Sequence, residues 1–158
     1  MKMLCIHSGH ITWKAKRKSK KAATRDELED KEECRVEDAL VTFITVEGDD
    51  DSGVVEKAVH EIDKIAKQIK TQRIVLFPFA HLFPEKVCNA EQAIEIFNQL
   101  ESKLAGYETS RVPFGWYKEF EIQSKGHPLA VLSRKISPDY KDFEIRTLSI
   151  LNKSDKKV

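Results

Sequence analysis

The feature that most constrains the fold is the direct succession of a buried strand pattern, a helical pattern and a second buried strand pattern. Residues 39–46 read ALVTFITV, a β-branched and aromatic run that is typical of a well-buried strand. Residues 54–69 place apolar side chains at helical spacing with charged side chains between them, and the apolar run RIVLFPF at 73–79 follows. This order predicts a β-helix-β unit inside an α/β domain.

The remaining segments predict a second helix and further strands. Residues 89–104 predict an amphipathic helix, which Asn89 begins as N-cap. Residues 116–123 alternate strongly and, with a Lys-Gly turn and a return strand at 129–134, predict a hairpin. At the amino end, residues 2–7 and 11–15 predict two short strands. The fold class is therefore α/β, a single mixed-sheet domain with two main helices.

Bulk properties limit the classes of protein that fit. The 158 residues suit one domain, assigned to residues 1–140, with 141–158 as a C-terminal extension or linker. Lys and Arg total 27 against 26 for Asp and Glu, so a nucleic-acid partner would have to be met by a local patch. The sequence has no signal-peptide run and no bilayer-spanning apolar stretch, which predicts a cytoplasmic protein.

Two blocks of opposite charge lie next to each other near the amino end. Residues 14–21 read KAKRKSKK and residues 26–33 read DELEDKEE. Such blocks, with few apolar residues, usually form a solvated loop. The functional alternative is that Lys16 to Lys21 contact a phosphate backbone.

Two residues are candidates for chemistry on position alone. His81 follows the predicted strand 73–79, and ligand sites in α/β sheets gather beyond the carboxyl ends of strands. Lys118 lies on the apolar face of the strand 116–123, between Trp116 and Phe120, which are interpreted as core residues. A lysine there either reaches an edge of the sheet or lines a polar pocket, where its pKa shifts readily.

The sequence indicates no cofactor and no metal. It has no phosphate-binding glycine loop, no GxSxG elbow and no dinucleotide-binding fingerprint. The partners that His81 would need for zinc are absent, and the three cysteines lack metal or redox spacing.

Several segments together resemble one family. The opening LCIHS, the strand FITVE, the strand-loop PFAHL, and above all VPFGWYKEF followed by SKGHPLAVLSR are similar to the amino-terminal editing domain of archaeal threonyl-tRNA synthetases. The resemblance runs from about Met1 to Ile136 with the blocks in the same order.

The resemblance implies a D-aminoacyl-tRNA deacylase-like fold, commonly a homodimer. It implies hydrolysis of L-serine wrongly esterified to threonine tRNA, at the seryl-adenosine ester of the acceptor end, in a synthetase whose catalytic domain acts in cis or in trans. Such editing is needed because one methyl group gives only about 1–3 kcal/mol of discrimination. The family's catalytic histidine and lysine fall on His81 and Lys118, and its substrate pocket falls on Ala80, Phe114, Tyr117 and Val46.

The chain departs from the family pattern CKGHPLAELSR at two positions, Ser124 and Val131. The resemblance places the missing glutamate in the pocket, where it could contact Lys118 or the substrate amino group. Two alternatives to the editing enzyme therefore stay open: a catalytically weakened tRNA-binding or dimerisation module, and a stand-alone D-aminoacyl-tRNA deacylase.

Overall fold

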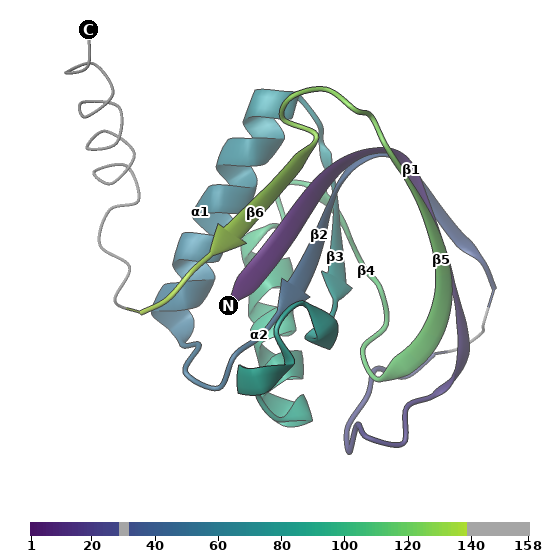
Figure 1. The fold of residues 1–158 in the computed structure, drawn as a ribbon, viewed down its shortest axis with the longest axis vertical. Helices are drawn as coiled ribbons and strands as arrows, with labels where there is room; N and C mark the ends of the chain where they lie inside the picture. The colour runs from purple at the N-terminus through teal and green to yellow at the C-terminus, as the bar shows by residue number, and fades with distance from the viewer. Residues whose placement is uncertain (29–31, 139–158) are drawn as a thin grey trace, which may run out of the picture.

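The computed structural model describes residues 1–28 and 32–138 and shows one mixed sheet with two α-helices on one face (Figure 1). The strands are β1 (Lys2–Lys18), β2 (Cys34–Thr45), β3 (Arg73–Pro78), β4 (Glu108–Arg111), β5 (Trp116–Ser124) and β6 (Val131–Lys135). The helices are α1 (Ser52–Ile69) and α2 (Ala90–Lys103). Two short 3₁₀ turns, η1 (Ala80–Leu82) and η2 (Pro84–Lys86), follow β3.

The sheet order is β4-β3-β2-β1-β5, and β6 pairs with β1 as well. Strands β2, β3 and β4 run parallel, whereas β1 is antiparallel to each of its neighbours. The predicted β-helix-β unit is confirmed as β2-α1-β3, and so is the single mixed sheet with two helices. The parallel strand β4, which follows α2, was not predicted.

Local capping fixes where both helices begin. The Asp51 side chain accepts a hydrogen bond from the Val54 amide at 2.9 Å, and the Asn89 side chain accepts one from the Gln92 amide at 2.8 Å. Each cap satisfies an amide that the helix leaves without an intrahelical partner. Asn89 is thus the N-cap that the sequence predicts.

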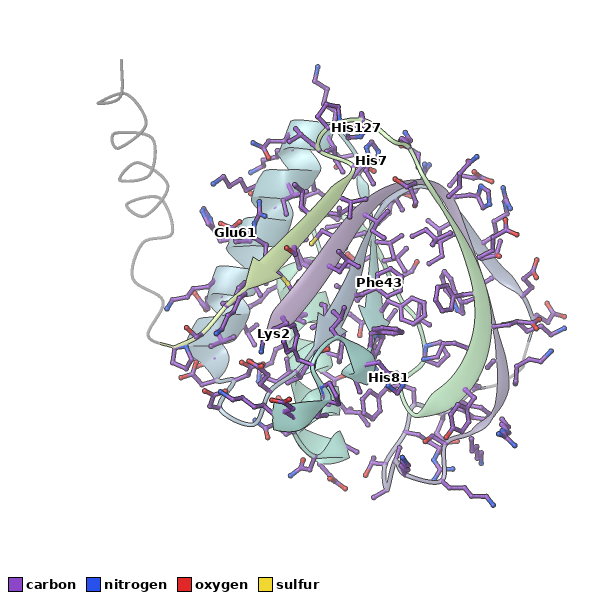
Figure 2. The ribbon with its side chains drawn as sticks, in the orientation of Figure 1. Lys2, His7, Phe43, Glu61, His81 and His127 are labelled. Carbon is purple, nitrogen blue, oxygen red and sulfur yellow. The ribbon has the colours of Figure 1, made fainter. Side chains whose placement is uncertain are left out.

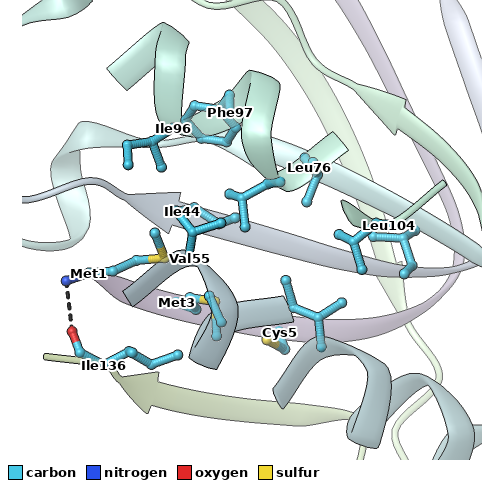
Figure 3. Close-up of a cluster of buried hydrophobic side chains, with 14 of the residues drawn as sticks. Met1, Met3, Cys5, Ile44, Val55, Leu76, Ile96, Phe97, Leu104 and Ile136 are labelled. Carbon is cyan, nitrogen blue, oxygen red and sulfur yellow. Dashed lines mark hydrogen bonds between the residues drawn. The ribbon is translucent and has the colours of Figure 1, made fainter. Parts of the chain in front are cut away.

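The larger core fills the space between the sheet and the two helices (Figure 3). The buried faces of α1 and α2 pack there against alternate residues of β1, β2 and β3, among them Met3, Cys5, Ile44 and Leu76. A second apolar cluster lies on the opposite face of the sheet, and no residue of either helix belongs to it. This second face carries the candidate site.

A buried ionic cluster anchors the amino end of β1. The Met1 ammonium donates to Asp50 Oδ1 at 2.6 Å, to Glu47 Oε2 at 2.9 Å and to the Ile136 carbonyl at 2.9 Å. Lys2 Nζ contacts the second oxygen of Glu47. The carboxylates of Glu47 and Asp50 are therefore neutralised by ammonium groups.

The two short strands predicted at the amino end are one strand of 17 residues, so that prediction is wrong. The break suggested near residue 9 is a register shift in the pairing of β1 with β5, between Ser8 and His10. Residues 16–18, predicted to be part of a loop, are also in β1, because the first residues of β5 pair with this end of the strand. A partner strand can order charged residues that have no strand pattern of their own.

The hairpin predicted at residues 125–126 is also wrong. β5 pairs with residues 8–18 of β1 and β6 pairs with residues 2–6, both antiparallel. The two strands therefore run in the same direction, one after the other, along β1. Gly126 lies in the connection between β5 and β6 and has a φ of +72°, a left-handed conformation that glycine adopts without steric cost.

We expect Gly115→Ala to destabilise the protein by roughly 1–3 kcal/mol. Gly115 has a φ of +79°, and an added Cβ would lie 2.5 Å from the Arg25 Cβ. Thermal and urea unfolding of the variant measure the loss. Gly48→Ala is the matched control, because an added Cβ meets nothing within 4 Å there. Equal stability of the two variants would contradict the steric argument.

Candidate functional site

Lys118 projects from β5 onto the sheet face that the helices leave uncovered. Its Nζ donates to the Pro113 carbonyl at 2.9 Å and lies 5.2 Å from the centre of the Phe77 ring. Desolvation by burial lowers the pKa of Lys118 to about 8, and the negative charge of Asp26 opposes that shift only in part. Within the described residues no carboxylate forms an ion pair with Lys118, so its ammonium keeps two N–H donors for a ligand.

His81 lies in η1, just beyond the carboxyl end of β3, and its side chain is exposed. Phe79, two residues before His81, is hydrogen-bonded to the end of β2. The Phe79 amide donates to the Ile44 carbonyl at 2.9 Å, and the Thr45 hydroxyl donates to the Phe79 carbonyl at 2.5 Å. These contacts hold the start of η1 in place, so His81 projects from an anchored turn.

A set of aromatic rings connects the two polar residues. Phe77 and Phe79 lie 6.0 Å apart between centroids, His81 stacks edge-on against Phe79 at 5.6 Å, and Lys118 covers Phe77. Phe43 and Phe120 complete the set, which we call the aromatic cluster. Figure 2 shows His81 and Phe43 between the central strands and the arc of β5. Lys118 and His81 thus lie at two ends of one apolar floor.

The structure separates the other predicted pocket residues. Ala80 is exposed in η1 beside His81. Tyr117 alternates with Lys118 along β5 and lies under the Arg17 guanidinium, 5.1 Å from ring centre to Cζ. Val46 and Phe114 pack with the helix-side core. Of these four residues, Ala80 alone adjoins His81 directly in the chain, and the binding roles of all four remain predictions.

Val131 does not share a pocket with Lys118 within one chain. Val131 is opposite Ile6 of β1, whereas Lys118 is opposite Ala15, nine residues further along the same strand. A strand rises by about 3.3 Å per residue, so the two positions are too far apart along β1 for direct contact. The expectation that a glutamate at 131 would pair with Lys118 is therefore wrong for a single copy of the chain.

Sequence reasoning missed two parts of the site. Phe120, interpreted as core, is 43% exposed and forms part of the aromatic cluster, whereas Trp116 is buried as expected. Asp26, in a segment predicted to be a solvated loop, accepts hydrogen bonds from Arg111 Nη2 and the Phe114 amide, both at 2.8 Å. Asp26 thereby holds the chain that leads into β5. Phe43 and Phe77 lie on a common face because they are paired in the parallel register of β2 and β3, which the sequence alone does not reveal.

A groove with a volume of about 620 Å³ adjoins Lys118. Pro113, which accepts the lysine hydrogen bond, and Ala15, which pairs with Lys118, both line it. Four carboxylates and one cation, Arg111, also line it, and Arg111 forms ion pairs with two of them, Asp26 and Glu101. The other lining residues are Trp13, Leu28 and Cys34. Negative surroundings of this kind favour a ligand with an ammonium group.

A second polar cluster, away from Lys118 and His81, links β1 to the connection between β5 and β6 (Figure 2). His7 Nδ1 lies 2.7 Å from His127 Nε2, and His7 Nε2 lies 3.1 Å from Asp38 Oδ1. The Leu129 amide donates to His127 Nδ1 at 3.2 Å. That bond requires His127 Nδ1 to lack a proton, so a neutral His127 donates to His7 and a neutral His7 donates to Asp38.

Stability should fall with acidification because of this cluster. Burial lowers the pKa of His7, against the hydrogen bond to Asp38, with Lys125 adding repulsion. Native protein thus binds fewer protons here than unfolded protein, so the contribution of His7 is complete above the unfolded pKa of about 6.5 and is lost as pH falls below it. We expect the free energy of unfolding, measured with urea, to fall more steeply for wild type than for His7→Gln as pH falls below about 6.5. Parallel stability curves for the two proteins would contradict this.

Three acidic residues, Glu47, Asp49 and Asp50, are close enough together to hold a metal ion. Two of them already neutralise the Met1 and Lys2 ammonium groups. The cluster is therefore accounted for as the anchor of β1. In the described part of the chain, no helix is long and apolar enough to cross a membrane.

The fold is that of a known class of α/β protein with one mixed sheet. The c-Myc DNA unwinding element binding protein has a similar fold, with a TM-score of 0.64 at 13% identity, over 85% of this chain and 98% of that one. At that identity the likeness concerns the fold alone. Residues 1–136 match the family model for the archaea-specific editing domain of threonyl-tRNA synthetase, and the chain belongs to that family.

The chain is similar in sequence to curated threonine–tRNA ligases. Those of Methanosarcina barkeri and Thermococcus kodakarensis are each 43% identical over 88% of this chain, and that of Methanococcus maripaludis is 43% identical over 97%. The chain spans 22–24% of the length of these relatives. The resemblance read from the sequence is thus confirmed at the level of the family.

Proposed function

We propose that this chain hydrolyses L-serine wrongly esterified to threonine tRNA, as the proofreading domain of a threonyl-tRNA synthetase. Family membership supports the editing role. The observation that carries the proposal is Lys118, a desolvated ammonium with free donors beside an apolar floor and without a carboxylate partner in the described structure. Such a group stabilises negative charge more strongly than an ammonium in water does.

In the proposed reaction, water attacks the ester carbonyl carbon and the bond to the ribose oxygen breaks. That oxygen takes up a proton, and serine and tRNA are released. Lys118 donates to the carbonyl oxygen as its negative charge develops. His81 orients the seryl group at the other end of the aromatic cluster, and the neighbouring ribose 2′-hydroxyl assists the water.

The substrate amino group also has a binding place under this proposal. The groove beside Lys118 receives the ammonium of the seryl group, because four carboxylates and one guanidinium line it. Val131 supports a catalytically weakened module less than the sequence suggested, because it lies far along β1 from Lys118. The editing enzyme is therefore better supported than the weakened module.

The proposal includes a homodimer and a cytoplasmic setting, where aminoacyl-tRNA is used. Phe120 and Val131 are 43% and 53% exposed on the sheet face that the helices do not cover, and a second copy of the chain would cover them. Sedimentation equilibrium tests the dimer directly. A mass of one chain at micromolar concentration would exclude it, and would leave the hydrolysis proposal standing.

A further inference from the structure

A basic strip at the end of β1 adjoins the candidate site and has no part in the chemistry above. We define the strip as Arg17, Lys18, Lys20 and Lys21, all of which are exposed. It begins where β1 pairs with the first residues of β5, Trp116 and Tyr117. Lys118, the next residue of β5, pairs with Ala15. The strip therefore begins on the strand next to Lys118 and continues beyond the end of β1 at Lys18.

The four cations of the strip lack carboxylate partners. Several other surface cations are paired with carboxylates, as Lys67 is with Asp63, Lys103 with Glu56 and Arg134 with Glu61. In residues 1–28 and 32–138, no carboxylate lies within ion-pair distance of any strip cation. Four like charges within five residues repel one another, and an anionic ligand relieves that repulsion.

Two aromatic rings of β5 lie opposite two of these cations. The Arg17 guanidinium lies 5.1 Å from the centre of the Tyr117 ring, and Lys18 Nζ lies 5.6 Å from that of Trp116. Tyr117 is 46% exposed, so part of its ring is open to a ligand. Cations that follow a phosphate backbone, together with an exposed ring on which a base can stack, are typical of single-strand binding surfaces.

We propose that the basic strip binds the phosphates of the single-stranded 3′ end of tRNA and thereby directs the terminal ester towards Lys118. This inference rests on the proposed function, because it takes its ligand from there. The net charge of the chain is +1, so the strip is a local device and not a consequence of overall charge. Contacts to phosphates carry no sequence information, so the strip sets position and not tRNA identity.

The test is the salt dependence of binding to uncharged tRNA(Thr), which needs no hydrolysis. Wild type is compared with a variant that replaces the whole strip by glutamine: Arg17→Gln, Lys18→Gln, Lys20→Gln and Lys21→Gln. Each lost contact to a single strand flattens log K against log[salt] by about 0.7, so the slope should become shallower by about 3. Affinity at 0.1 M salt should fall by roughly 10²–10³-fold.

The matched control removes four lysines on and just after α1, on the opposite side of the sheet: Lys57→Gln, Lys64→Gln, Lys67→Gln and Lys70→Gln. It should keep the wild-type slope to within about one unit. Equal flattening in both variants, an unchanged slope in the strip variant, or no tRNA binding by wild type would overturn the inference. Hydrolysis of seryl-adenosine, which has no phosphate, should be retained by the strip variant. Its absence in wild type would count against the proposed function and not against the strip.

Discussion

Replacing Lys118 by methionine should slow deacylation of seryl-tRNA(Thr) by roughly 10²–10³-fold, the effect of losing one oxyanion donor. Methionine keeps about the length of the side chain and removes the charge. The fold should survive, because an unbranched apolar side chain packs well above Phe77. Single-turnover deacylation, with thermal unfolding as the control for folding, measures both expectations.

The pH profile separates this role from simple packing. The pKa of Lys118 is about 8, so its ammonium form is lost as pH rises through that value. After subtraction of uncatalysed hydrolysis, the wild-type rate should fall above about pH 8, and the residual rate of Lys118→Met should lack that fall. Deacylation by the variant at the wild-type rate and normal stability would reduce Lys118 to a packing residue.

Asp50→Ala should cost about 3–5 kcal/mol in the free energy of unfolding, because it breaks a buried ion pair from one side. The Asp50 side chain is fully buried, contacts the Met1 ammonium at 2.6 Å and accepts from the Glu47 amide at 2.8 Å. Chemical denaturation gives the value. Asp49→Ala is the matched control, since Asp49 is exposed, and should change stability by no more than about 0.5 kcal/mol. Similar losses in both variants would contradict the role given to the buried cluster.

The elements predicted best from the sequence are those that carry their own periodicity. The helix predicted at 54–69 is Ser52–Ile69, the one predicted at 89–104 is Ala90–Lys103, and the strand predicted at 116–123 is Trp116–Ser124. Each has an apolar face that must be buried, so its pattern is set by the element itself. Because residues 116–124 are a strand, Lys118 lies on the predicted face of β5.

The elements predicted wrongly depend on partners far away in the chain. The sequence signal for a turn at Gly126 does not say whether the next strand pairs with β5 or with β1. In the structure β6 pairs with the part of β1 that β5 leaves free. Residues 16–18 are strand only because β5 lies beside them. The short strand β4 is ordered by β3 in the same way. Local propensity cannot contain this information.

In the candidate site, too, local features could be predicted from the sequence, whereas contacts between distant segments could not. Strand alternation put Lys118 on an apolar face, and the chain order put His81 at a strand end, so both could be predicted. One aromatic cluster connects Lys118 and His81 because the rings of Phe77 and Phe120, from different strands, lie 5.0 Å apart between centroids. The sequence does not reveal this contact. The separation of Val131 from Lys118 likewise followed from the pairing register and from nothing local.

The central claim is tested most directly by deacylation of purified seryl-tRNA(Thr) by the 158-residue chain, with threonyl-tRNA(Thr) as the matched substrate. We expect serine to be released well above the spontaneous rate, while the threonyl ester is largely spared. Release of neither amino acid above the spontaneous rate, or release of both at equal rates, would contradict a proofreading function.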